Sequence, residues 1–549
     1  MRFFLIVTLV LPFAVGGCAK PDPSIGLELL SAKPPTRLRL NEVLEFKPAE
    51  GHYFNLKAPQ NCAEFDFQTK SPRVLRCQIT EPGTHAIALS VCDDKATYCR
   101  FAKFPVIADA PKGWKAGKSV RKATHAAPKG VRHPIPGFVD NDPEKALAMA
   151  KKDGKLLLID FYGIWCPPCN MLDEYVYKEK KFQDASSDLV RVALDADAPL
   201  SWDWKAKFKV GGYPTVIIAD AELNEIGRIV GYRPVGSYLK WMSEQKALRD
   251  EPIEKALKAE LTLARKRRLG EWRYNRREYT EAIKLLEGVK DKDLLETYWV
   301  AKQKKAAKEK EKTAENEALK VLIEKFPDSI SYAGRVLSYA EVDKKYASSR
   351  FDSVLANLKR WRNSPKLDAT GYEEGDLYDL EADIWAERGD EKKKIVAYTK
   401  ASEYYKTLAA KSSLLVARAA NMSRAYFLRV SGDVEGAKKL YEALASAYSN
   451  EFTFNYSYAS TLRKLKEFDK AYGFIKKAEA NAYGDNWLRA IHLKAKIEIA
   501  LKRPSDAIKT LELGLAEAVI PSNTDVRTYR YVERLRNLLT DLESGKKAA

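Results

Sequence analysis

Apolar residues between positions 25 and 108 gather in short runs that proline, glycine and asparagine separate. The runs read RLRLNEVLEF, HYFNL, RVLRCQIT, HAIALSVC and RFAKFPVIA. Each has the length of a β-strand, and the turn residues recur at a spacing typical of all-β domains. Residues 25–108 are therefore predicted to form an antiparallel β-sandwich.

Residues 138–247 alternate between strand-like and helical patterns. The run LLLIDFYG, which begins at Leu156, predicts a buried strand. The other predicted strands are LVRVALDAD, PTVIIAD and EIGRIVGY, and the predicted helices are PEKALAMAKKDGK, PCNMLDEYVYKEKKF, WDWKAKFKV and VGSYLKWMSEQ. This order predicts an α/β sheet in which a Cys-x-x-Cys motif follows a central strand.

Residues 109–137 lie between these two regions and are rich in Lys, Ala, Gly and Pro without apolar periodicity. Such a composition predicts a flexible basic linker. The domains on either side are therefore expected to move against each other.

Residues 250–545 show helical patterns with a repeat. Alanines recur at spacings of 34 and 36 residues, at Ala437, Ala471 and Ala507. A large apolar residue follows each alanine four positions later, at Tyr441, Ile475 and Leu511. Earlier units contain Gly270 with Ala282, and Tyr378, Ala382, Trp385, Tyr398 and Ala401. The spacing resembles that of tetratricopeptide repeats, in which small residues let paired helices approach closely. Residues 290–375 match the repeat poorly, and for them the sequence predicts helices without a repeat.

The composition is that of a globular protein with several domains. A chain of 549 residues is longer than one hydrophobic core usually accommodates. A content of 45% hydrophobic residues is sufficient for several packed cores. The formal charge of +19 is spread over helical faces without an aromatic-studded basic stripe, so no nucleic-acid partner is predicted. Attraction of the positively charged surface to anionic lipid headgroups is an alternative that the same charge allows.

The N-terminus carries a targeting signal. Arg2 precedes an apolar run, residues 3–15, that is too short to span a bilayer and reads as a signal peptide over residues 1–17. The small residues before Cys18 resemble the lipobox of bacterial lipoproteins, which implies cleavage and lipidation at Cys18. A plain signal peptide with an incidental cysteine is the alternative. Because Ala19 carries no charge, the resemblance implies a periplasmic protein anchored in the outer rather than the inner membrane.

The remaining six cysteines all lie within the first 170 residues: Cys62, Cys77, Cys92, Cys99, Cys166 and Cys169. An even number in an exported protein favours disulfides or dithiol pairs. Residues 171–549 contain no cysteine, so the redox chemistry is confined to the front third of the chain.

Three chemistries compete for the motif WCPPC at Cys166 and Cys169. Structural zinc needs two further ligands, but the only histidine beyond residue 133 is His492, so no metal is predicted. A structural disulfide at this spacing closes a tight loop and constrains the unfolded chain little. Redox chemistry needs an exposed thiolate at a helix N-terminus with a resolving thiol one turn further, and a helix after a buried strand supplies both. No haem or nucleotide motif occurs, so no cofactor is predicted.

The stretch DFYGIWCPPC, together with GGYPT downstream, resembles the thioredoxin fold. The resemblance implies that Cys166 is the attacking nucleophile and Cys169 the resolving cysteine. It also implies that Trp165 flanks the site, that Pro214 is a cis-proline, and that Asp160 is a buried acid that helps to deprotonate Cys169. The alternative for Asp160 is a strand-end residue bonded to backbone.

A longer stretch, from DGKLLLID to GRIVGY, resembles the C-terminal periplasmic domain of DsbD-type thiol:disulfide interchange proteins, and Asp173 matches an acid of that family. The segment SVCDDKATYCRFAKFPV resembles the redox pair of the family's immunoglobulin-like N-terminal domain, which makes Cys92 and Cys99 a second exchanging pair. Cys62 and Cys77 are interpreted as a structural disulfide. The family's membrane domain is missing from this sequence. Pro167 and Pro168 depart from the commonest thioredoxin dipeptide, so the reduction potential of the family cannot be assigned to this pair.

These observations lead to one hypothesis for the whole chain. It is a lipid-anchored periplasmic thiol–disulfide oxidoreductase that reduces disulfide-bearing client proteins, and its repeats bind a protein or peptide. An oxidase or isomerase of disulfides is the alternative among enzymes. A scaffold lipoprotein, whose thioredoxin fold only binds, is the alternative from another class.

Overall fold

The computed structural model describes residues 26–39, 43–54, 75–78, 83–94, 99–109, 135–411, 417–518 and 527–544. Contacts divide the chain into two compact units, one of residues 1–120 with 512–532 and one of residues 121–511 with 533–549. The predicted signal peptide with Cys18, and most of the predicted linker, lie outside the described residues. None of the helices in the described part of the chain has the length and apolar character that a membrane crossing requires.

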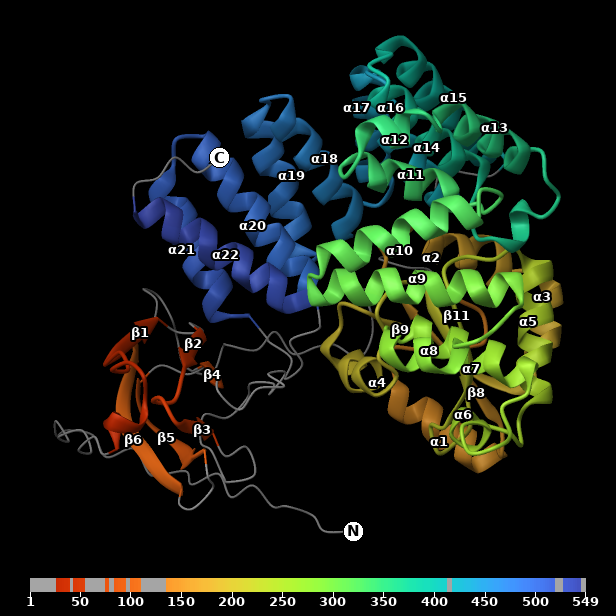
Figure 1. Ribbon diagram of the computed structural model, residues 1–549. Coiled ribbons are helices and arrows are strands. Elements are labelled where there is room, and N and C mark those ends of the chain that lie inside the picture. The colour runs from red at the N-terminus through yellow and green to blue at the C-terminus, as the bar shows by residue number, and fades with distance from the viewer. Residues whose placement is uncertain are drawn as a thin grey trace. The chain divides into compact units, whose positions relative to one another are not determined.

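The first unit contains two sheets, and Figure 1 shows the long neighbouring strands of the larger one. The larger sheet has the order β1 (Arg37–Arg39), β6 (Cys99–Asp109), β5 (Gly83–Asp93) and β3 (His52–Phe54), and the smaller pairs β2 (Val43–Phe46) with β4 (Leu75–Gln78). A short turn of helix, η1 (Leu27–Leu29), precedes them. Leu44 and Phe46 of the smaller sheet share one hydrophobic core with Ile87, Leu89 and Phe104 of the larger. A two-sheet domain is therefore present, and its immunoglobulin-like identity stays a prediction.

The prediction that this domain is purely antiparallel is wrong at one edge. The run RLRLNEVLEF divides into β1 and β2, which belong to different sheets. Strand β1 pairs with β6 in parallel, with Arg37 opposite Ile107. A parallel pair needs a long connection, and the chain between β1 and β6 is long enough to supply it.

The second unit begins with a five-stranded mixed sheet of order β11-β10-β8-β9-β7. Its strands are β7 (Phe138–Asp140), β8 (Leu156–Tyr162), β9 (Leu189–Asp195), β10 (Thr215–Ala219) and β11 (Glu225–Val230). Its helices are α1 (Pro143–Asp153), α2 (Pro167–Leu172), η2 (Asp173–Tyr177), α3 (Lys180–Ala185), η3 (Pro199–Ser201), α4 (Trp202–Lys207) and α5 (Val235–Ala247). Strands β7 and β8 run parallel to β9, whereas β10 runs antiparallel to β8. The α/β order predicted from the sequence is confirmed, apart from β7, which is too short to stand out as an apolar run.

Strand β8 is buried along its whole length and separates two cores. Leu156 and Leu158 join the cluster that contains residues of η2, α3 and α5, whereas Leu157, Ile159 and Phe161 join the cluster on the other face. Side chains alternate between the faces of a strand. Asp160 therefore belongs to the face of Leu158, beneath the helical layer that follows the Cys-x-x-Cys motif.

The single helix predicted over residues 168–182 is wrong, because the chain breaks into α2, η2 and α3. Glu179 adopts an extended backbone (φ −68°, ψ 132°) between η2 and α3. The break turns the chain so that Phe182 packs against Tyr177 and Tyr238, with ring centroids 5.0 and 5.9 Å away. Burial of these aromatic rings outweighs the continuity of one helix.

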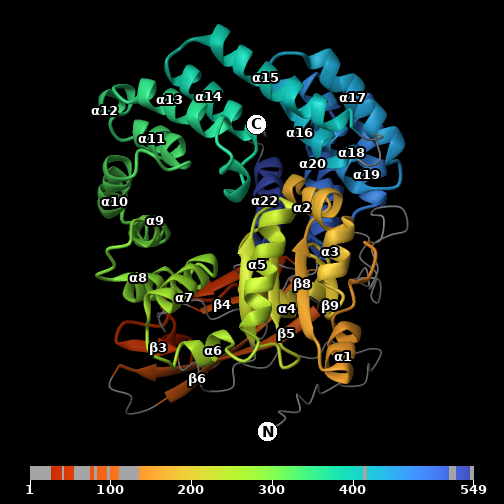
Figure 2. The same cartoon turned by 90° about the vertical axis from the view of Figure 1, so that its right-hand side faces the viewer.

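The described chain beyond residue 250 is helical, and Figure 2 shows α7 to α19 following one another in chain order. The helices are α6 (Ile253–Ala256), α7 (Leu263–Asn275), α8 (Tyr279–Leu286), α9 (Lys292–Glu309), α10 (Lys312–Lys325), α11 (Tyr332–Ala340), α12 (Lys344–Ser348), α13 (Phe351–Arg362), η4 (Leu367–Ala369), α14 (Glu374–Glu387), α15 (Glu391–Ala409), α16 (Arg418–Val430), α17 (Val434–Ala447), α18 (Phe452–Lys464), α19 (Phe468–Ala480), α20 (Gly484–Ala500), α21 (Pro504–Ala516) and α22 (Arg527–Glu543). Consecutive helices pack on one another from α6 to α12 and from α13 to α20, as the repeat pattern predicted.

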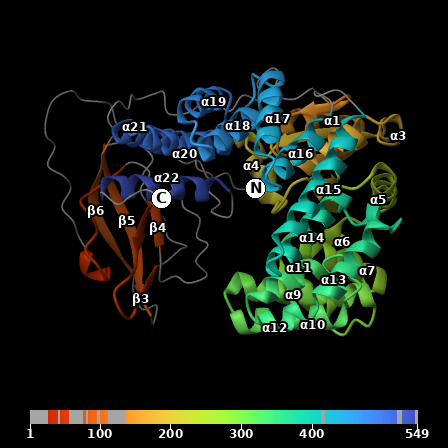
Figure 3. The same ribbon diagram turned by 90° about the horizontal axis from the view of Figure 1, so that it is seen from above.

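The small residues of the repeat pattern lie at helix contacts. Ala437, Ala471 and Ala507 are completely buried, on α17, α19 and α21. A methyl group at Gly270 would approach Leu286 of the neighbouring helix to 2.6 Å. Figure 3 shows α18, α19 and α20 close together, and these three helices contact one another. These contacts confirm why the positions are small: the helices approach too closely for a larger side chain.

The repeats also pack on the α/β sheet within the second unit. Helix α7 contacts β11, and α16 contacts α2. Arg268 of α7 donates a hydrogen bond to the backbone oxygen of Ile226 at 2.8 Å. The α/β region and the repeats are therefore in direct contact, and one of the contacts involves the helix that carries the Cys-x-x-Cys motif.

Candidate active site

Cys166 and Cys169 form a disulfide where β8 gives way to α2. Cys166 is the N-cap of α2, and its sulfur accepts a hydrogen bond from the backbone N–H of Cys169 at 3.3 Å. Pro167 and Pro168 occupy the first helical positions, where an N–H group would have no intrahelical partner. The positive end of a helix favours a thiolate at this position.

The Trp165 ring connects the motif to the loop that precedes β10. A methyl group at Gly163 would fall 2.7 Å from this ring, so only glycine lets it lie against the backbone there. The ring meets Tyr213 edge to face with centroids 5.9 Å apart. The Tyr213–Pro214 peptide bond is cis, as the resemblance implied. The structure therefore brings the motif and the cis-proline loop together.

Asp160 is buried, with 1% of its surface exposed. Burial raises the pKa of Tyr177, and the charge of Asp160 raises it further, so the carboxylate lies close to this phenol in the interior. Asp173 is also buried, at the start of η2. Both acids that the resemblance implied therefore lie inside the layer around α2. The proposed action of Asp160 on Cys169 stays a prediction.

The expectation of an exposed attacking sulfur is wrong in this structure. Cys166 has 4% of its surface exposed and Cys169 has 2%. In an isolated α/β domain the N-terminal end of α2 would face solvent. Here the helical repeats contact the residues around the motif, from three different helix pairs.

The first contact comes from Arg418 at the start of α16. Its guanidinium donates to the backbone oxygen of Ile164 at 3.0 Å and forms a buried ion pair with Glu451 at 2.7 Å. It also lies over the rings of Tyr448 and Phe454, at 4.8 and 4.6 Å from their centroids. Arg418 therefore connects the residue two positions before Cys166 to the interior of the repeats.

Glu174 forms the second part of the α16 contact. Its carboxylate accepts a hydrogen bond at 3.2 Å from the backbone N–H of Ala419, in the first turn of α16. An acid at this place satisfies a helix N-terminal donor. Burial raises the pKa of Glu174 to about 8, in spite of this hydrogen bond. Beside it, Asn170 of α2 lies 3.7 Å from the sulfur of Met422.

Helix α20 contacts the other flank of the motif. The indole N–H of Trp165 donates to Asp197 at 2.6 Å, and the side-chain amide of Asn486 donates to the same carboxylate oxygen at 2.8 Å. Tyr483 donates from its hydroxyl to Asp195. Asp197 thus joins the tryptophan of the motif to α20 through two short hydrogen bonds.

The turn between α7 and α8 provides the third contact. Arg277 donates to the backbone oxygen of Gly211, and Glu278 pairs with Lys209 at 2.6 Å. Both partners lie in the loop that leads to Pro214. Repeat residues thus contact the segment before Cys166, the ring of Trp165 through Asp197, and the approach to the cis-proline.

Sequence reasoning did not identify these contact residues as part of the site. Asp195 ends β9, which runs parallel to β8, and Asp197 follows two residues later. Because the carboxyl ends of parallel strands meet at one sheet edge, this signal was available. For Arg418 and Asn486 the repeat pattern offers no signal, because both lie far from the motif in sequence.

The predicted second redox pair, Cys92 and Cys99, is also disulfide-bonded. The two cysteines stand opposite each other on β5 and β6, with Cα atoms 4.0 Å apart. Cys92 is buried, whereas Cys99 is exposed. Cys62 lies outside the described residues, and so does the side chain of Cys77, so the predicted bond between them stays a prediction.

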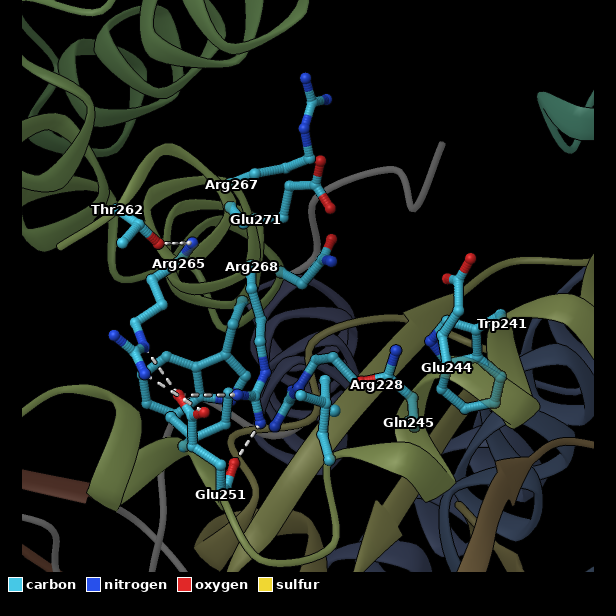
Figure 4. Close-up of a pocket in the computed structure, with 16 residues that line it drawn as sticks. Arg228, Trp241, Glu244, Gln245, Glu251, Thr262, Arg265, Arg267, Arg268 and Glu271 are labelled. Atoms are coloured by element: carbon cyan, nitrogen blue, oxygen red, sulfur yellow. Dashed lines mark hydrogen bonds and ion pairs between the residues drawn. The ribbon is translucent and has the colours of Figure 1, made fainter. Parts of the chain in front are cut away.

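Among the described residues, no group of three or more His, Cys, Asp or Glu side chains is placed to hold a metal ion. A cavity of about 560 Å³ lies between β11, α5 and α7, apart from the disulfide. Figure 4 shows Arg228 and Arg268 pointing toward one another there, with Arg265 and Arg268 bonded to Glu251. Arg265 and Arg268 are thus already paired with Glu251, and Arg228 is paired with Glu225.

Comparison with known proteins agrees with the geometry of the motif. Residues 143–246 match the family described as thioredoxin-like domain. This part of the chain is a thioredoxin-like domain.

Curated relatives match about a fifth of the chain. The thiol:disulfide interchange protein DsbD of Yersinia pestis (strain Pestoides F) is 27% identical over 114 residues, which are 20% of this chain and 19% of that protein. The DsbD protein of Cronobacter sakazakii (strain ATCC BAA-894) is 34% identical over 96 residues, 17% of this chain and 16% of that protein. The chain thus spans less than a fifth of the length of these relatives.

Among solved structures, a tetratricopeptide repeat protein from Parabacteroides merdae ATCC 43184 is similar at 12% identity, with a TM-score of 0.22, over 44% of this chain and 99% of that chain. The chain joins its thioredoxin-like domain to a series of packed helices.

Proposed function

We propose that the protein is a thiol–disulfide oxidoreductase that reduces disulfides of client proteins. The observation that carries this proposal is the Cys166–Cys169 disulfide at the start of α2, beside the cis peptide bond before Pro214. The similarity to DsbD proteins supports the reaction class. The reducing direction rests on the resemblance of both redox regions to a reductive relay.

The reaction starts from the reduced pair. The thiolate of Cys166 attacks one sulfur of the client disulfide, and the other client sulfur leaves as a thiolate and takes up a proton. Cys169 loses its proton to Asp160 or water and attacks Cys166 in the mixed disulfide, which releases the second client thiol. The client gains two electrons and two protons, and the Cys166–Cys169 disulfide returns. A dithiol must then reduce the pair again and is itself oxidised to a disulfide.

The Cys92–Cys99 disulfide is the internal redox partner in this proposal. Cys99 is exposed and Cys92 is buried, so an attacking thiolate would meet the sulfur of Cys99 first. Cys92 would leave as the thiolate.

The proposed location is the periplasm, with the chain anchored to the outer membrane through a lipid on Cys18. The sequence before Cys18 supports this proposal. Cys18→Ser should abolish labelling by a fatty-acid probe, and recovery of the labelled protein only in inner-membrane fractions would contradict the placement.

The repeats are proposed to bind a protein or peptide. A cavity of about 920 Å³ lies among α7, α9, α10, α11 and α13 and supports this role, with polar side chains such as Glu296, Arg335 and Tyr372 in its lining. Stacked helix pairs commonly receive peptides on such surfaces.

The direct test is insulin reduction by the full chain. Cys166→Ser should reduce the rate to background, because no other thiol replaces the nucleophile. The control is Cys62→Ser combined with Cys77→Ser, which should retain activity. Activity that survives in Cys166→Ser would contradict the proposal.

A scaffold function is the second candidate, and the 4% exposure of Cys166 is the observation that favours it. A scaffold would bind partners without reducing insulin, and Cys166→Ser would not change that binding. An enzyme whose site opens would reduce insulin and lose that activity in the same variant.

A further inference from the structure

The contacts around the disulfide come from repeat residues that lie far from the motif in sequence. Arg418 bonds to Ile164, and Asn486 bonds to the carboxylate that also holds Trp165. Asn486 and Asp197 are both buried, so these are packed contacts. A partner protein cannot place its own sulfur beside Cys166 while they persist.

The geometry points to a gate: we propose that α16 and α20 control which reductants and clients reach the Cys166–Cys169 pair. Small thiols enter with the helices in place, whereas proteins react only when α20 separates from the Asp195–Asp197 segment. The inference rests on the proposed function, because it concerns access to the same disulfide.

Arg489 extends the α20 side of this gate. Its guanidinium lies 5.8 Å from the Trp165 ring centroid, and 5.2 and 4.8 Å from those of Phe452 and Tyr456 on α18. It also donates to Asn486 at 3.0 Å. Cation–aromatic contacts and hydrogen bonds thus connect Trp165 to two helices of the repeats. Movement of α20 would alter the surroundings of the motif directly.

Gly484, the first residue of α20, provides a way to loosen the gate without touching a bonded side chain. A methyl group there would fall far inside contact distance of the backbone oxygen of Asp197. Its φ of 52° is also in the left-handed region, so an alanine is strained for a second reason. Gly389 has a φ of 72° and nothing within 4 Å of the same hypothetical methyl group. Gly389→Ala therefore reproduces the backbone strain without the clash.

The experiment follows reduction of the disulfide in the full chain by two probes, dithiothreitol and a reduced thioredoxin. In each case a thiolate of the probe attacks the disulfide, the released cysteine takes up a proton, and the second probe thiol closes the probe's own disulfide. The chain gains two electrons and two protons, and the probe loses them. The two probes therefore perform the same chemistry and differ in size.

A gated site predicts different responses to the two probes. Gly484→Ala should speed reduction by thioredoxin about tenfold and change reduction by dithiothreitol less than about twofold, because only the protein probe depends on the open population. Gly389→Ala should change neither rate. Equal rates for Gly484→Ala and the wild type, or an equal increase with both probes, would overturn the gate.

A second measurement needs no variant, in case Gly484→Ala does not fold. For the wild type, the rate should saturate with thioredoxin concentration at the rate of opening, and it should stay proportional to dithiothreitol concentration. Proportionality with both probes would overturn the gate. If neither probe reduces the pair in the folded chain, the proposed oxidoreductase function fails instead. The two failures are thus distinguishable.

Discussion

The two disulfides that the structure describes join their cysteines in different surroundings. Cys92 and Cys99 face each other across neighbouring strands, and Cys99 is exposed. Cys166 and Cys169 span the first turn of a helix, and both are buried. The exposed bond needs no change in its surroundings to be attacked, whereas the buried bond depends on contacts made by a distant part of the chain.

The difference also concerns the thiolates that each bond releases. The dipole of α2 and the N–H group of Cys169 favour a thiolate at Cys166. Two paired strands offer no such dipole. The Cys166–Cys169 pair is therefore suited to act as the nucleophile. The Cys92–Cys99 disulfide is exposed at Cys99 and is suited to be attacked. A relay from the first to the second uses both properties.

The largest expected effect comes from removing the resolving thiol. Cys169→Ser should accumulate a mixed disulfide between Cys166 and Cys99, because Cys99 is the exposed sulfur of its pair. Peptide mapping under non-reducing conditions would detect it. When Cys62→Ser and Cys77→Ser are added to Cys169→Ser, the trapped mixed disulfide should persist. A chain that is trapped only with other proteins would show that the two disulfides do not exchange.

The next effect concerns the burial that distinguishes the helical pair. Arg418→Ala should lower the free energy of unfolding of the second unit by about 3–5 kcal/mol, because it leaves Glu451 buried without its partner. Chemical unfolding followed by tryptophan fluorescence would measure the change. Arg388→Ala is the matched control, since Arg388 pairs with the exposed Asp352 at 2.7 Å and such pairs contribute little. Similar losses in both variants would contradict the importance of the α16 contact.

A smaller effect should follow from Asp160→Asn. If the buried carboxylate takes the proton of Cys169, its loss should slow resolution of the mixed disulfide about a hundredfold. The first attack by Cys166 should not change. Stopped-flow measurement of both steps against pH would separate them. An unchanged resolution rate would favour the strand-end role for Asp160.

The smallest effect is a dependence of the α16 contact on pH. The raised pKa of Glu174, about 8, means that the docked state holds a proton that the undocked carboxyl releases near its ordinary pKa. Docking is therefore most stable at low pH and weakens as the pH rises from about 4.5 to about 8.

Glu174→Gln should remove this dependence, because the amide accepts the same hydrogen bond without ionising. The groups that act on Glu174 are Lys178, Asp173, Arg418 and the N–H of Ala419. Unfolding midpoints of both proteins between pH 5 and 9 would test the prediction. If the unfolding midpoints of the wild type and Glu174→Gln change with pH in the same way, the prediction is contradicted.

Much of the α/β domain could be predicted from the sequence, because local patterns determine it. The apolar run from Leu156 predicts a strand buried on both faces, and the motif that follows predicts a helix with Cys166 at its start. The resemblance to the thioredoxin fold implied the cis bond before Pro214. The spacing of Ala437, Ala471 and Ala507 predicted the helix pairs, since small residues are required where helices touch.

The exposure of Cys166 could not be predicted in this way. A pattern within the motif specifies the helix terminus and the thiol chemistry, but access depends on what packs against it. Arg418 and Asn486 reach the motif only because the stacked repeats bring α16 and α20 back to the thioredoxin-like domain. No local periodicity encodes that return. The sequence by itself determined the chemistry of the disulfide, and the tertiary structure decided its access, because burial depends on residues that are distant in the chain.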